Sequence, residues 1–270
     1  MTARSGQSAA VLCVQGFPLF NRQWRPVSPR AFVSEALAGD PVQGVIYHAV
    51  VRELGPGLWH WDAPHPDWSG PENEALRQRL AATAETPSKA GVVSSYAIDN
   101  GDQVLLFDPL AAPREIVELA ADRQPAIVLT CPWHERDTES LVERLGAAVF
   151  VPRPDEGSPD VAWLLVGDTV EGRLFSAGDQ LPVGVEAFPG QKPNDAVLWI
   201  ESHRAVIAGD TLADFGDGPQ INPRWLTPTM TREQVVEGLR PLLELPVEHV
   251  LATHGGPFDR AALERALSPS

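Results

Sequence analysis

The sequence predicts an α+β protein in which two strand-rich halves each carry outer helices. The first observation is the turn dipeptide Asn100-Gly101, which lies between apolar runs at 92–99 and 103–110. The second is a similar turn at 202–203 between two further apolar runs. Helical segments flank the strands in both halves, so we expect sheets that are covered by helices on their outer sides.

Residues 1–45 differ from the rest and are interpreted as an N-terminal extension. The run AVLCV at 10–14 suits a strand. Ser28 is a favourable N-cap for a short helix over 29–39, because proline follows it and glycine ends the segment. Residues 46–270 are expected to form the main domain.

The first half of this domain combines strands with three helices. Proline at 64 and 66 makes the end of the aromatic run GLWHWDAPHPDW a loop. Pro113 begins one helix, and Asp137 is the expected cap of another that ends at Gly146. The expected elements are strand 45–54, loop 57–68, helix 72–84, hairpin 92–110, helix 113–122, strand 126–130, helix 138–146 and strand 147–152.

The second half is strand-rich up to residue 210, where its hairpin ends. Thr231 and Gln234 form a capping box for a helix over 233–245. A last buried strand, HVLATHGG, precedes a terminal helix at 259–267. Loops after strands often carry chemistry. Several strands here end in polar residues: Thr130-Cys131, Gly190-Gln191, Gly209-Asp210 and Thr253-His254.

Composition limits the classes of function. The net charge of −15 argues against partners that need basic patches, so we expect no nucleic acid and no anionic membrane. The two cysteines, Cys13 and Cys131, make no disulfide framework, which fits a reducing compartment. The N-terminus does not resemble a signal peptide, and no apolar run approaches the roughly 20 residues of a membrane span. We therefore expect a cytoplasmic protein.

Five segments stand in a characteristic order: SSYAIDNGDQVLLFDPL (94–110), LTCPWHERDTESL (129–141), FPGQKPNDAVLWI (188–200), VIAGDTL (206–212) and LATHGGPF (251–258). In order and spacing they resemble the metallo-β-lactamase superfamily, whose later motifs usually read T-H-x-H-x-D-H, P-G-H-T-P-G-S, G-D and G-H-G. The resemblance covers about residues 46–265. It implies a four-layer αβ/βα sandwich with its site at one edge, and hydrolysis assisted by one or two metal ions, commonly zinc.

The first metal position of this superfamily departs from the usual pattern. In an alignment without gaps, Cys131 and Trp133 replace its first two histidines, and Gln191 replaces the histidine of the middle segment. Indole nitrogen is only a hydrogen-bond donor, and a side-chain amide is a poor zinc ligand. We expect this position to be lost, with Trp133 filling its volume.

The second metal position keeps three possible ligands: Glu135, Asp210 and His254. These residues could hold one ion of zinc, iron or manganese, with Asp210 and His254 as catalytic residues. However, Arg136 replaces a third histidine and brings a permanent cation to the same place. The alternative is therefore a salt-bridged remnant in which Arg136 neutralises Glu135 or Asp210.

The residues between these positions have alternative interpretations. His134 faces away from the site in the alignment without gaps, but an insertion of one or two residues would make His134 and Asp137 ligands. Cys131 is either a small buried residue or a nucleophile that needs a lowered pKa. A substrate pocket is predicted to involve Trp59, Trp61, His65, Trp133, His134 and Gln191, although aromatic residues more often pack in a core.

Two functions follow from these residues. The first is a divergent protein without the dinuclear centre and without a cofactor, which is non-canonical or catalytically inactive and binds a small molecule or a partner in the former cleft. The second is a mononuclear metal-dependent hydrolase of an ester, lactone or thioester that uses Glu135, Asp210 and His254. Self-association into a homo-oligomer is possible in either case.

Overall fold

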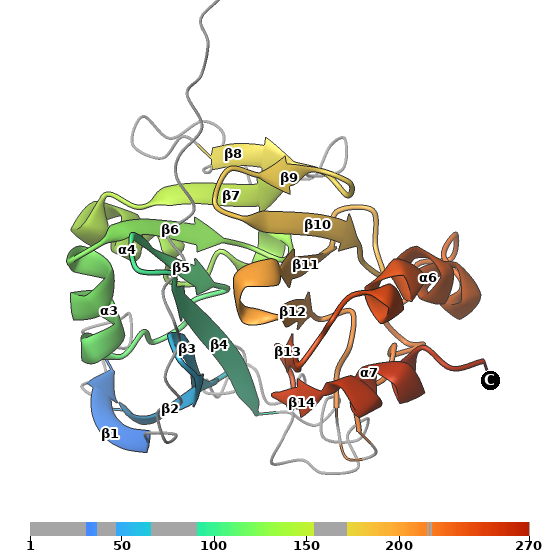
Figure 1. The fold of residues 1–270 in the computed structure, drawn as a ribbon, viewed down its shortest axis with the longest axis horizontal. Helices are drawn as coiled ribbons and strands as arrows, with labels where there is room; N and C mark the ends of the chain where they lie inside the picture. Colours follow the sequence, from blue (N-terminus) through green and yellow to red (C-terminus); the bar gives the residue numbers. More distant parts are fainter. Residues whose placement is uncertain are drawn as a thin grey trace, which may run out of the picture.

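The first eight strands form one mixed sheet in chain order (Figure 1). The structure, a computed structural model, describes residues 31–36, 47–65, 91–153, 172–214, 216 and 218–269. The sheet is antiparallel from β1 to β5 and parallel from β5 to β8. Its strands are β1 Ala31–Ala36, β2 Tyr47–Gly55, β3 Leu58–Pro64, β4 Val92–Asp99, β5 Gln103–Phe107, β6 Gln124–Val128, β7 Ala148–Pro152 and β8 Gly172–Phe175.

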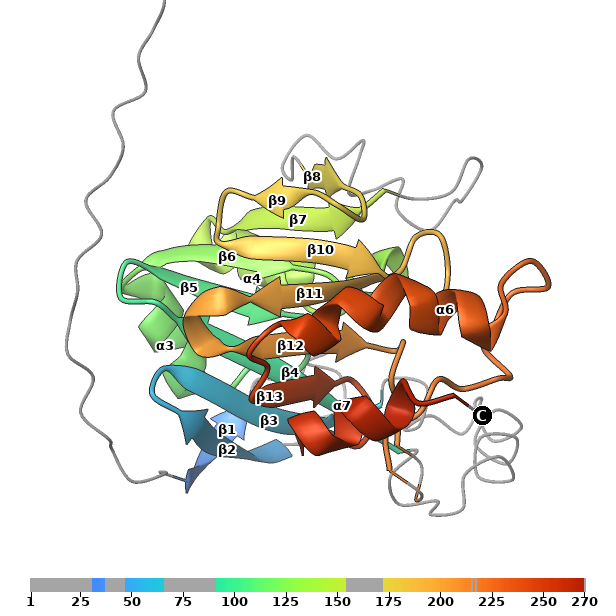
Figure 2. The same cartoon turned by 45° about the vertical axis from the view of Figure 1, so that its right-hand side comes forward.

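The remaining strands form a second sheet of six, in which β12 and β13 are parallel and the other neighbours are antiparallel (Figure 2). In spatial order they are β14 Phe258–Asp259, β13 His249–Ala252, β12 Ala205–Gly209, β11 Ala196–Ile200, β10 Val185–Pro189 and β9 Gln180–Leu181.

Residues 31–36, the described part of the segment 29–39, do not form the helix expected from the capping signal. Instead Ala31–Ala36 is strand β1, which pairs antiparallel with β2 so that Ala31 lies opposite Arg52. Pairing with a neighbouring strand outweighs a local helix-start signal, because it satisfies a whole row of backbone groups. The other predictions in the N-terminal extension, and the helix expected over 72–84, lie outside the described residues.

Two of the predicted helix caps are present in the structure. Helix α4 ends at Gly146, whose φ of 64° is the left-handed conformation of a C-cap glycine. Thr231 and Gln234 form the full capping box at the start of α6. The α-helices described are α3 Arg114–Ala121, α4 Thr138–Leu145, α6 Arg232–Leu239 and α7 Arg260–Ala266, and the 3₁₀ segments are η3 Pro132–His134, η5 Glu201–His203 and η6 Arg240–Glu244.

Three clusters of buried side chains show which elements face one another. The first packs Ile116 of α3 and Leu141 of α4 on one face of the eight-stranded sheet. The second fills the space between the two sheets, and the third packs Val235 of α6 and Leu263 of α7 on the outer face of the six-stranded sheet. The two sheets thus face each other, with helices on both outer sides (Figures 1 and 2). The predicted α+β class is confirmed.

The two sheets are joined at one edge, where several strands end. Ala196 N–H donates to Thr130 O (2.8 Å), and Ser94 N–H donates to Thr253 O (2.8 Å). Gly209, the last residue of β12, approaches the loop after β6 so closely that a Cβ there would lie 2.6 Å from Thr130 Oγ1. No helix among the described residues has the length and apolar character to cross a membrane.

We predict that Gly209→Ala destabilises the protein far more than Gly146→Ala. Both glycines have a positive φ, 53° and 64°, so the backbone cost of about 1 kcal/mol is shared. Only at position 209 would the added methyl group also collide with Thr130, and this overpacking adds about 1–3 kcal/mol of destabilisation. Denaturant unfolding of both variants measures the difference, and equal losses would contradict the close contact.

Candidate functional site

Five polar side chains meet at the joined edge of the two sheets, and we call them the edge site. Asp108 follows β5, His134 lies in η3 after β6, Gln191 follows β10, Asp210 follows β12 and His254 follows β13. Four of the five are at most 7% exposed, and the Asp210 side chain is 14% exposed. The strand ends that the sequence singled out therefore do converge.

The Asp108 side chain is held in place by hydrogen bonds to both of its carboxylate oxygens. Its Oδ1 accepts the Thr130 backbone N–H (2.8 Å), and its Oδ2 accepts the Thr130 hydroxyl (2.6 Å). The same Oδ2 accepts Nδ1–H of His134 (3.0 Å). Asp108 has a φ of 44°, unusual for a residue with a side chain, so the surrounding contacts hold its backbone in place.

His134 bridges two carboxylates. Its Nδ1 binds Asp108, and its Nε2 lies 3.4 Å from Asp210 Oδ2. Burial disfavours a charged imidazole and acts to lower the pKa of His134, but the negative charges around it, those of Asp210 and Asp108 among them, raise that pKa well above its ordinary value.

Asp210 is correspondingly held as a carboxylate. Burial would raise the pKa of Asp210, but the charge and hydrogen bond of His134, followed by His254 and Arg136, lower it far below its usual range. Its Oδ2 faces His134, while its buried Oδ1 has no hydrogen-bond partner and lies 3.6 Å from His254 Nε2.

His254 is a neutral imidazole next to this carboxylate. Burial lowers the pKa of His254 to about 4, although the Asp210 charge acts in the opposite direction. Its ring is stacked with His65 at 6.0 Å between centroids and is tilted against Trp225 at 5.6 Å. Of the early aromatic segment, His65 thus reaches the edge site, and Trp225 joins it from the later loop.

Gln191 and Asp195 extend the edge site on the six-stranded sheet. The Gln191 amide donates to the backbone oxygen of Asp210 (2.8 Å), and its backbone N–H donates to Thr211 Oγ1 (3.2 Å). The Thr211 hydroxyl in turn donates to Asp195 Oδ2 (2.8 Å). Burial, and then the charge of Asp210, raise the pKa of Asp195 to about 7.

The orientation expected for His134 from the alignment without gaps was wrong. Residues 132–134 form a 3₁₀ turn in which His134 N–H donates to Cys131 O (3.2 Å), and this turn directs the imidazole toward Asp210. Trp133 instead lies edge-on to His134, with Lys192 Nζ 4.3 Å from the centre of its ring.

Arg136 and Asp137 bind backbone rather than the groups expected for them. Arg136 donates to Asp108 O (2.7 Å), and it influences Asp210 only as a nearby charge, so the closest cation to Asp210 is His134. Asp137 precedes α4 as predicted, but its side chain does not cap the helix. Its carboxylate accepts Ala111 N–H (2.6 Å) and thereby ties the loops after β5 and β6 together.

Trp61 lies in the core of the protein rather than at the edge site. Trp61 is 0% exposed, packs in the cluster beneath α3 and α4, and donates its indole N–H to Leu110 O (2.8 Å). Trp59 packs against the same cluster, because residues two apart on a strand share a face. The prediction that Trp61 lines a pocket was wrong, and Trp59 lies on the same side of the sheet.

Cys131 lacks the properties of a nucleophile. The thiol is 0% exposed, and burial raises its pKa well above the ordinary range, although His134 acts in the opposite direction. A reactive cysteine needs access and a stabilised thiolate. The alternative of a small buried residue at a strand end therefore describes Cys131 better.

The described residues do not fit a metal centre of the kind this architecture implies. In the ranges described, no group of three or more His, Cys, Asp or Glu side chains is arranged to hold a metal ion, and this includes Glu135 with Asp210 and His254. Both ring nitrogens of His134 face carboxylates, with Nδ1 at 3.0 Å from Asp108 Oδ2 and Nε2 at 3.4 Å from Asp210 Oδ2.

Sequence reasoning did not select Asp108, Thr130, Asp195 or Trp225 as site residues. Asp108 had a usable signal, since it follows a buried strand just as Asp210 does. Asp195 and Trp225 lie in loops whose position depends on contacts distant in sequence. No local pattern marks them.

Comparison with solved structures gives the class of fold. The chain is similar to DIM-1 metallo-β-lactamase exposed to ceftazidime (TM-score 0.55, 11% identity, 81% of this chain and 94% of that chain). It is also similar to the metallo-β-lactamases from Hirschia baltica and Pontibacter korlensis, each with a TM-score of 0.53, 16% identity and 81% of this chain covered, with 96% and 97% of those chains. No protein-family profile and no curated protein sequence matches the chain. The protein has the metallo-β-lactamase fold, and the predicted resemblance is confirmed at that level.

We predict an unusual pH dependence for Asp195. Its folded-state pKa is raised to about 7, so the folded state binds the proton more tightly than the unfolded state. The stability it contributes is complete below about pH 4 and is lost as the pH rises through 7. Relative to Asp195→Asn, the free energy of unfolding of the wild type should fall by on the order of 3 kcal/mol between pH 4 and 8.

Urea unfolding of the wild type and Asp195→Asn at several pH values measures this difference. Asp122→Asn, at an exposed aspartate beyond α3, is the control and should show no such trend. A difference that grows in the opposite direction would show that Asp195 is ionised in the folded protein.

Proposed function

We propose that this chain is a metallo-β-lactamase-fold protein that works without the dinuclear metal centre, and that it binds a small molecule or a partner at the edge site. The bridge from Asp108 through His134 to Asp210 carries this proposal. In it a protein cation occupies the contact with Asp210 that a metal ion would otherwise take.

Three further features support a binding role. The side chains of Asp210 and His254 remain 14% and 9% exposed, so a ligand can reach them. His65 and Trp225 both place an aromatic ring next to His254. Asp210 Oδ1 and Gln191 Oε1 are buried acceptors without a hydrogen-bond partner, which a ligand or water with a donor group would satisfy.

The second candidate is a mononuclear metal-dependent hydrolase of an ester, lactone or thioester. The observation in its favour is that Asp210 and His254 do lie side by side, with 3.6 Å between Oδ1 and Nε2. It requires a third ligand to move into this pair. This candidate predicts that His254→Ala removes both metal and turnover.

We predict that purified protein contains less than about 0.1 zinc, iron or manganese ion per chain, because His134 already neutralises Asp210. Elemental analysis by inductively coupled plasma mass spectrometry, after expression with each metal added, measures this. Near-stoichiometric metal that disappears in His254→Ala would overturn the proposal in favour of the hydrolase.

We also predict that His134→Ala destabilises the protein by about 3–5 kcal/mol, because it leaves two buried carboxylates without their shared cation. The double variant His134→Ala/Asp210→Asn should recover part of this loss, since one uncompensated charge is gone. His249→Ala, a half-buried histidine outside the edge site, is the control. Equal losses for His134→Ala and the control would show that the bridge does not stabilise the fold.

A further inference from the structure

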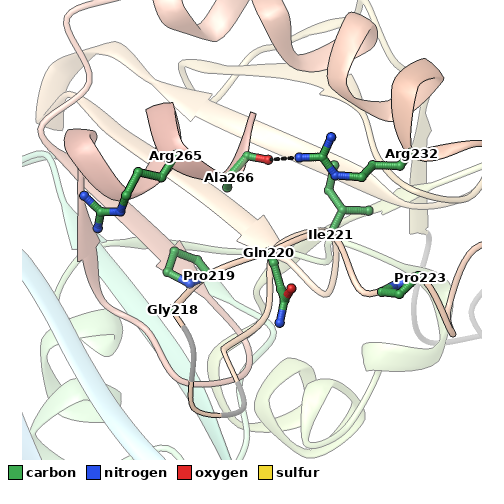
Figure 3. A pocket seen from close by; sticks show the side chains of 8 residues that line it. All are labelled: Gly218, Pro219, Gln220, Ile221, Pro223, Arg232, Arg265 and Ala266. Atoms are coloured by element: carbon green, nitrogen blue, oxygen red, sulfur yellow. Dashed lines mark hydrogen bonds between the residues drawn. The ribbon is translucent and has the colours of Figure 1, made fainter. Parts of the chain in front are cut away.

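A second candidate site lies on the outer side of the six-stranded sheet. It is a cavity of about 380 Å³ between α6, α7 and the loop over 218–223 (Figure 3). None of the residues that line it belongs to the edge site. The proposed function makes no use of this cavity.

The charge of the lining is opposite to that of the chain. The chain has 36 acidic and 21 basic residues, yet the charged side chains that line the cavity are two arginines, Arg232 and Arg265. Two nearby arginines are paired: Arg240, the first residue of η6, with Glu237 (2.8 Å), and Arg260, the first residue of α7, with Glu264 (2.7 Å).

Arg232 is held in a defined position at the cavity. One of its terminal nitrogens donates to Ala266 O and to Ser268 O, both at 2.9 Å, which joins the start of α6 to the end of α7 (Figure 3). A guanidinium has five N–H donors, so these two bonds leave others for a ligand. Because the fold already orders this side chain, a ligand that binds it causes little further loss of side-chain conformational entropy.

The opposite wall, the loop over 218–223, carries both apolar and polar side chains and is also held by backbone hydrogen bonds. Ala213 and Gln220 exchange two backbone hydrogen bonds of 3.0 Å, and Gly218 N–H donates to Asp214 Oδ1 (2.9 Å). Pro219 and Ile221 lie on this segment and are buried (Figure 3). The cavity thus combines a carbon-lined wall with guanidinium groups, which suits a ligand that carries an anionic group on a short carbon skeleton.

We propose that this cavity binds a small organic anion through Arg232, and that the exposed Arg265 side chain, which extends away from Arg232 in Figure 3, turns toward the bound group. The shared chemistry is a carboxylate or phosphate group, which matches the donor geometry of a guanidinium. The cavity volume accommodates a few carbon atoms beyond that group. The net negative charge of the chain repels anions in general, so an anion that binds here must be held by the residues of the cavity themselves.

The test is a titration of the full chain, labelled with ¹⁵N, followed by heteronuclear NMR. The probes are inorganic phosphate, glycerol 3-phosphate and succinate, with sodium chloride at matched ionic strength as the blank. We expect saturable shifts of the Gly218, Gln220 and Ala266 amides, and tighter binding of the two organic anions than of phosphate. A preference between glycerol 3-phosphate and succinate identifies the anionic group.

The variant Arg265→Gln, at an exposed position on α7, should weaken binding about tenfold while the fold is retained. Arg224→Gln removes the same charge from an exposed arginine in the adjacent loop that does not line the cavity, and it should leave the affinity within about twofold. Shifts that do not saturate, or equal weakening by both variants, would overturn the proposal.

Discussion

The edge of the molecule depends on one buried histidine side chain, His134, placed between two carboxylates. Asp108 comes from the eight-stranded sheet and Asp210 from the six-stranded sheet, so His134 joins the sheets as well as their charges. A buried charge is tolerated only when it is paired and hydrogen-bonded. Thr130 completes the arrangement by occupying both oxygens of Asp108. The same bridge that supports the fold thus also determines which chemistry the edge site can perform.

Most of the fold could be predicted because its signals are local. The turn at Asn100-Gly101, the C-cap at Gly146 and the capping box at Thr231 each act over a few residues, and each is present in the structure. Strand β1 could not be predicted in this way. Its pairing with β2 depends on backbone groups far along the chain, and the capping signal at Ser28 pointed to a helix instead.

The candidate site was only partly predictable, because strand ends are visible in a sequence while side-chain directions are not. Gln191, Asp210 and His254 converge as expected. The direction of His134 depends on the 3₁₀ turn over 132–134, which a gap-free comparison of motifs cannot represent. The prediction for Trp61 was wrong for a related reason. Strand β3 continues to Pro64, and because side chains alternate between the two faces of a strand, the Trp61 indole points into the core.

The carboxylate–imidazole–carboxylate bridge also bears on how this scaffold would be redesigned. Histidines grafted at positions 131, 133 and 191 would restore a familiar motif on paper. They would still meet His134, which lies against Asp210 with one ring nitrogen and against Asp108 with the other. An engineer would first have to remove that imidazole and supply new support for Asp108.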